Sequence, residues 1–145
     1  MTSPDGLIAA QSGLRSRFED FRHALDRRDE AALRLALMDF HAHLLLWTTA
    51  EERVLLPALE RTTFPGRDPQ RELRLEYVQI RELTRYLLSQ IEGHAPIADV
   101  LGLVENLDRR LSAHESEMEK VYYPSAAPVL TSEEWRLLTE ASPPP

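Results

Sequence analysis

The chain has 145 residues, no cysteine and a formal net charge of −7. That length is enough for a single domain, residues 1–145, with a buried core, and the lack of cysteine excludes disulfides and thiolate metal sites. The acidic balance disfavours nucleic acid or an anionic membrane as a partner. No apolar run is long enough to span a membrane, and residues 1–11 lack the pattern of a signal peptide, so we expect a cytoplasmic protein. Lys120 is the only lysine among 17 basic residues, a bias typical of a GC-rich bacterial genome.

The first half of the chain predicts two long helices. Apolar residues recur at alternating steps of four and three over residues 6–26 and again over about 30–61. Asp29 is placed to cap the second of these helices. Pro57 falls late in the second pattern, where a proline should kink or end the helix.

The second half predicts two more long helices and a short one. Asp68 before Pro69 is a typical helix start, and a helix from there should close at Gly93. The next helix should run from about Pro96 until Pro124 stops it. Residues 131–134 have capping-box spacing and predict a helix over about 132–139. The proline-rich tail, residues 142–145, should be disordered.

These elements predict an all-α fold. Four long helices with short connections form most simply an up-down-up-down antiparallel four-helix bundle, here over about residues 6–124, with a short extra helix at the C-terminus. The chain also repeats itself, because residues 50–57 read AEERVLLP and residues 117–124 read EMEKVYYP. Two copies of a helical hairpin predict two matching half-sites.

Six residues on the apolar stripes are not simple aliphatics. In the predicted topology, the start of the first helix, the end of the second, the start of the third and the end of the fourth lie at one level. The six residues fall at these places and should form one layer inside the core: Gln11, Trp47, Glu51, Tyr77, His114 and Met118. Such a polar layer is costly unless its groups satisfy one another or a ligand.

The pattern resembles the hemerythrin-like family, also called the HHE cation-binding domain. The two repeated phrases are similar to the wording around the family's HxxxE motifs, and the resemblance extends over about residues 7–135. It implies a four-helix bundle with a non-haem di-iron centre. The family's ligands would be a His on the first helix, HxxxE on the second, a His on the third and HxxxE on the fourth.

Most of those ligand positions differ in this sequence. The two single His positions hold Gln11 and Tyr77, the first HxxxE reads Trp47 to Glu51, and the second reads His114 to Met118. Only Glu51 and His114 keep the family's residue types. Trp47 has no lone pair to offer and Met118 is a soft thioether, whereas an iron pair needs several anionic oxygens and imidazoles. We therefore expect no di-iron centre and no bound cofactor.

Three interpretations of the layer follow. Glu51 and His114 are either a pair retained after metal loss or an acid and a base acting on a bound small molecule, with Tyr77 or Gln11 orienting it. Alternatively, Glu51, His114 and Tyr77 hold a single iron that handles oxygen, peroxide or nitric oxide, as family members do. Gln11, Trp47 and Met118 either fill the core or line a ligand pocket.

The sequence favours the small-molecule interpretation. Aromatic walls with a few polar groups are typical of small-molecule pockets, and the former metal cavity would bind or transform an organic molecule, as in specialised metabolism. Whether the protein is an enzyme is left open. A structural or interaction module is the further alternative, and exposed Leu35, Leu46 and Tyr86 are candidates for the contact of a homodimer.

Overall fold

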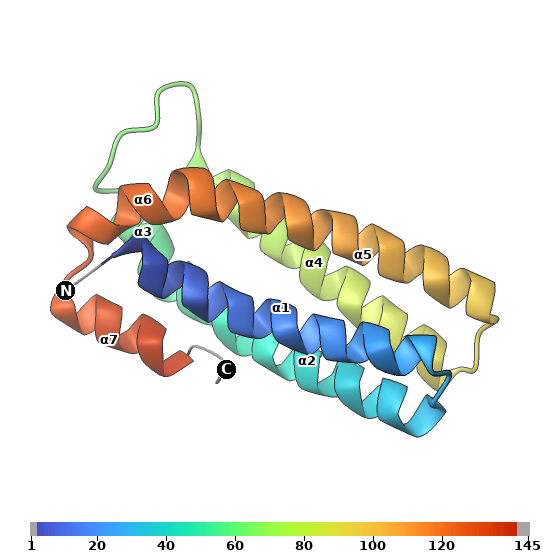
Figure 1. The fold of residues 1–145 in the computed structure, drawn as a ribbon. Helices are drawn as coiled ribbons and strands as arrows, with labels where there is room; N and C mark the ends of the chain where they lie inside the picture. The colour runs from blue at the N-terminus through green and yellow to red at the C-terminus, as the bar shows by residue number, and fades with distance from the viewer. Residues whose placement is uncertain (1–2, 142–145) are drawn as a thin grey trace.

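The computed structural model describes residues 3–141, which form an antiparallel bundle of four long helices (Figure 1). The long helices are α1 (Pro4–Asp26), α2 (Glu30–Ala50), α4 (Pro69–Glu92) and α5 (Ile97–Glu117). The short α7 (Ser132–Ala141) packs beside the end of α2. The described residues contain no strand, and no helix among them is long and apolar enough to cross a membrane. The predicted all-α bundle with an extra C-terminal helix is confirmed.

Capping residues fix the helix boundaries close to where the sequence places them. The side chains of Asp29 and Asp68 accept hydrogen bonds from backbone N–H groups in the first turns of α2 and α4. Gly93 caps the end of α4. Thr131 and Glu134 form the predicted capping box, because each side chain accepts the other residue's backbone N–H. The predicted tail, residues 142–145, lies outside the described residues.

Neither Pro57 nor Pro124 ends its helix in the structure. The second helix passes through one π-helical turn, Glu51–Leu55, into α3 (Leu56–Leu59). The fourth passes through an equivalent turn, Met118–Tyr122, into α6 (Tyr123–Ala126) and a 3₁₀ turn, Ala127–Val129. The prediction that Pro124 stops the fourth helix is therefore wrong. A π turn bonds each N–H five residues back, and this wider turn accepts a proline that an α-helix would not.

Helices from different halves of the repeat meet along two seams, α1 with α5 and α2 with α4. The two seams have similar contacts. On one seam, the α1 residue Arg15 reaches Glu115 on α5. On the other, the α4 residue Arg81 reaches Thr48 on α2, with Nε to Oγ1 at 2.9 Å. Arg15 and Arg81 hold equivalent positions of the sequence repeat, as do Glu115 and Thr48. The duplication thus survives as an approximate two-fold relation between the halves, and both arginines lie one helical turn beyond the predicted layer.

Candidate functional site

All six residues of the predicted layer lie in the interior of the bundle. None of the six is more than 8 % exposed, and Glu51, Tyr77 and Met118 are fully buried. Gln11, Trp47, Glu51 and His114 line one small cavity. The rings of Tyr77 and His114 meet edge-on with their centroids 5.5 Å apart, so Tyr77 lies next to this group of residues. Met118 is buried one turn beyond His114 on the same helix.

Glu51 is a buried carboxyl group with a tyrosine as its hydrogen-bond partner. Tyr123 Oη lies 3.1 Å from Glu51 Oε2 and 3.2 Å from Gln11 Oε1. Burial raises the pKa of Glu51 to about 7, although the charge of His114 and the hydrogen bond from Tyr123 act to lower it. Both protonation states are therefore populated near neutral pH. When Glu51 is protonated its hydroxyl can donate to Tyr123, which then donates to Gln11.

His114 has a different carboxylate partner. Its Nδ1 donates a 2.6 Å hydrogen bond to Glu76 Oε1 on α4, and no direct hydrogen bond joins it to Glu51. Burial alone would lower the pKa of His114. The hydrogen bond to Glu76 and the charges of Glu51 and Glu76 outweigh that effect and raise the pKa. The surviving acid and base of the layer thus have different hydrogen-bond partners, Tyr123 for Glu51 and Glu76 for His114, although the charge of each acts on the pKa of the other.

Three polar atoms of the layer make no hydrogen bond of good geometry among the described residues: Trp47 Nε1, Glu51 Oε1 and Tyr77 Oη. Tyr77 is nevertheless close enough to Glu51 to act on its pKa, and Trp47 is close enough to Tyr123 to act on the pKa of that phenol. Burial and the charge of Glu51 raise the pKa of Tyr77 well above its ordinary value, so this phenol stays neutral and is a donor. The adjacent cavity has a volume of about 20 Å³, which suffices for one water molecule. Unsatisfied groups this deeply buried are rare in native proteins.

Tyr123 and Glu76 are the two site residues that sequence reasoning missed. In a continuous α-helix the residue five positions after Met118 points away from the layer, whereas the π turn Met118–Tyr122 brings it back to the same face. The signal available in the sequence was the tyrosine at the position where the first copy of the repeat has Leu56. Glu76 lies on a flank of α4, beside Tyr77. Its partner His114 is on α5, so the pairing can be seen only when the packing of the two helices is known.

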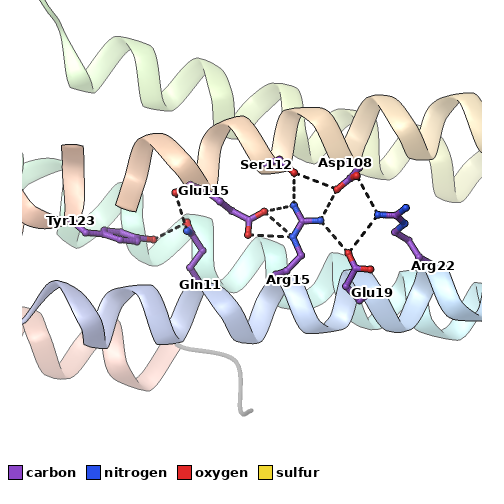
Figure 2. Close-up of polar contacts among 8 residues, drawn as sticks. All are labelled: Gln11, Arg15, Glu19, Arg22, Asp108, Ser112, Glu115 and Tyr123. Atoms are coloured by element: carbon purple, nitrogen blue, oxygen red, sulfur yellow. Dashed lines mark hydrogen bonds and ion pairs between the residues drawn. The ribbon is translucent and has the colours of Figure 1, made fainter. Parts of the chain in front are cut away.

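A charged network connects the layer to the surface between α1 and α5 (Figure 2). Arg15 lies at its centre, with Nε 2.9 Å from Glu115 Oε1 and Nη1 2.6 Å from Asp108 Oδ1. Gln11 Nε2 donates to the backbone oxygen of Glu115 at 3.3 Å, so the network begins in the layer itself. Burial opposes the charge of Arg15, but its contacts with Glu115 and Asp108 outweigh that effect and raise its pKa. Arg15 and Glu115 also form one wall of the cavity.

The fold and the layer together define a class of protein: a duplicated antiparallel four-helix bundle that carries a site in its interior on facing helices. Residues 6–126 match the hemerythrin HHE cation-binding domain. The chain belongs to this family. No curated protein and no solved structure matches it significantly.

The donors present do not fit the di-iron centre that the family implies. Of the positions where the family's ligands fall, two hold a tryptophan and a methionine, and Glu51 and His114 alone supply a carboxylate and an imidazole. Within residues 3–141, no three His, Cys, Asp or Glu side chains are grouped so that they could hold a metal ion. Two iron ions need more oxygen and nitrogen ligands than this set provides.

Proposed function

We propose that this chain is a hemerythrin-like protein that uses the layer to bind a small polar molecule in place of a di-iron centre. The observation that carries the proposal is that three buried polar atoms of the layer, Trp47 Nε1, Tyr77 Oη and Glu51 Oε1, make no hydrogen bond of good geometry. Trp47 and Glu51 line the cavity, and Tyr77 lies against His114 in its wall. Trp47 and Tyr77 would donate hydrogen bonds to the molecule, and Glu51 would either accept or donate, depending on its protonation. A cytoplasmic location is part of this proposal.

The size of the cavity limits the molecule. A cavity of about 20 Å³ is far below the roughly 300 Å³ of typical sites for drug-sized ligands. An organic ligand therefore has only a few heavy atoms, or the seam between α1 and α5 opens to admit it. Short alcohols, aldehydes, amides and carboxylic acids meet the hydrogen-bonding requirement. Because the closed cavity holds only one water molecule, they would enter it only if this seam opens.

The chemistry that the side chains of the layer themselves support best is proton transfer. The pKa of Glu51, about 7, suits a group that takes up and releases a proton near neutral pH. Tyr123 and Gln11 extend a hydrogen-bonded chain from Glu51 through the interior. His114, held by Glu76, would supply positive charge toward a bound anion.

The fluorescence of Trp47 tests this proposal. Trp135 is first replaced by phenylalanine, so that Trp47 is the only tryptophan, and the protein is titrated with compounds of few heavy atoms. We expect one chemical class to give a saturable change. Tyr77→Phe should weaken its binding roughly threefold to tenfold, because one hydrogen bond is lost. Tyr86→Phe, at an exposed position of α4, is the matched control and should not change the affinity. Equal behaviour of the two variants, or no saturable change at all, would refute the proposal.

A single iron is the second candidate, and one observation favours it. Glu76 holds His114 through Nδ1, which leaves Nε2 as the other ring nitrogen, and such carboxylate–histidine pairs are common behind metal ligands. Glu51 Oε1 and Tyr77 Oη would be the oxygen ligands. This candidate predicts one iron per chain and a visible absorption band from a ferric phenolate that Tyr77→Phe abolishes. Iron-free protein would eliminate it.

A further inference from the structure

The outward face of α2 carries a second apolar stripe, separate from the one that faces the core. Its residues follow one another at steps of four and three: Ala31, Leu35, Met38, Ala42, Leu45 and Thr49. Leu46 lies beside the stripe. Leu35 and Leu46 are each 60 % exposed, and Met38 and Leu45 about 40 %. Alternating steps of four and three are the spacing by which one helix packs lengthwise against another.

The stripe is not needed for the bundle. The core-facing stripe of α2 is fully buried at Leu37, Phe40 and Leu44, and one apolar stripe is all that a helix at the surface of a bundle needs. Contiguous exposed apolar patches on otherwise polar proteins mark interaction sites. The neighbouring α4 packs against α2, and its Leu75, Val78 and Tyr86 are also about half exposed.

We propose that this face binds a second copy of the chain, with the two α2 helices antiparallel across a two-fold axis near Ala42. A stripe that repeats along a helix is complementary to itself, as a two-fold interface requires. At 1.5 Å per residue, 19 residues of α2 form a strip about 27 Å long. A strip one helix wide is smaller than the roughly 800 Å² per partner of a standard interface, so the exposed residues of α4 belong to the contact.

The charges on α4 fit an antiparallel pairing. Glu82 and Arg85 lie between Val78 and Tyr86, and Glu82 Oε1 lies 3.7 Å from Arg85 Nη2. Arg85 lies near the level of Ala42, because α4 contacts α2 through Arg81 and Thr48 on one side of this level and through Glu92 and Arg34 on the other. Across the proposed axis the α4 sides of both copies face each other, so that Glu82 of one copy meets Arg85 of the other, and the reverse. Such flanking charges select partner and orientation. The inference does not depend on what the interior layer binds.

Sedimentation equilibrium over a range of concentrations tests the interface. We expect a dimer of the wild-type chain, and a dissociation constant at least about tenfold higher for the Leu35→Glu/Leu46→Glu variant, because two charges would be buried against apolar surface. Leu101→Glu, at an exposed apolar position of α5, is the control and should leave the dimer intact. Circular dichroism checks that each variant is folded. A wild-type chain that is monomeric throughout, or a dimer that the double variant does not weaken, would overturn the proposal.

A charge swap tests the antiparallel orientation. Glu82→Arg and Arg85→Glu should each weaken the dimer, because each places like charges opposite one another, and the double swap should restore it. A double swap that dissociates as readily as the single variants would exclude this orientation. Lys120→Glu, on the π turn of the fourth helix and away from the face, is a charge-changing control and should have no effect.

Discussion

The carboxyl group of Glu51 is fully buried, and the amount by which this burial lowers the free energy of unfolding depends on pH. A rise in pKa from 4.5 to about 7 corresponds to roughly 3 kcal/mol. The folded state holds the proton more tightly than the unfolded state, so this group makes the protein less stable as pH rises from 4.5 to 7, and the loss is complete above 7.

Glu51→Gln removes this cost, and we expect it to stabilise the protein at pH 8 by up to roughly 3 kcal/mol and to have little effect at pH 4.5. The amide can still accept the hydrogen bond of Tyr123. Urea unfolding at the two pH values measures both numbers. A gain that is the same at both pH values would show that the pKa of Glu51 is not raised in the folded protein.

His114 changes stability in the same direction. Its pKa is raised in the folded state, so its contribution is complete below 6.5 and is lost as pH rises through the folded pKa. His114→Gln should therefore lower the free energy of unfolding more at pH 5.5 than at pH 9. A loss that is equal at both pH values would contradict the raised pKa of His114.

The sequence predicted that the six residues of the layer are buried, which the structure confirms, but it did not predict their partners. Helical periodicity and the repeat placed Gln11, Trp47 and Glu51 at one level, because both depend only on spacing along a helix. The contact of Tyr123 with Glu51 depends on a π turn, and that of Glu76 with His114 depends on how α4 packs against α5. Neither feature leaves a periodic signal.

At the scale of elements, each π turn begins at a residue of the layer, Glu51 or Met118, and a proline follows it. Pro57 follows Glu51–Leu55 and Pro124 follows Met118–Tyr122. A proline inside a regular helix costs about 3 kcal/mol because it loses a hydrogen bond and its ring meets the preceding turn. The wider turns relieve this conflict, and they bring Tyr123 to the layer. The predictions of helix starts succeeded because caps are local, whereas this adjustment was not visible in the sequence.

We expect Pro57→Ala to change the free energy of unfolding by less than about 1 kcal/mol, because the π turn already accommodates the proline. A proline placed at Thr49, in the regular part of α2, should cost about 3 kcal/mol. Urea unfolding of both variants measures the difference. Equal losses would mean that the π turn does not relieve the conflict.

Arg15 joins α1 to α5 where the two helices meet through long side chains. Arg15→Met should destabilise the protein by about 1–3 kcal/mol, because it leaves partly buried carboxylates of Glu115 and Asp108 without their main partner. Arg22→Met removes a more exposed contact to the same Asp108 and should cost less than about 1 kcal/mol. A larger loss at Arg22 would contradict this account of the seam.

For the whole molecule, duplication explains both what is retained and what is lost. Both halves keep a π turn, a proline and an arginine that closes a seam, and these features maintain the bundle. At the positions that correspond to the family's ligands the two halves differ, since one has Glu51 and the other has His114. The family's fold can tolerate this because the core on either side of the layer is apolar and continuous.

The metal content of the native protein tests the central claim most directly, namely that the layer no longer holds a di-iron centre. The protein is purified without chelator from cells grown with added iron, and iron is counted per chain by elemental analysis. We predict well below one iron per chain, because the donors are too few to hold a pair. Two irons per chain, with the spectroscopic signature of a bridged pair, would contradict the account.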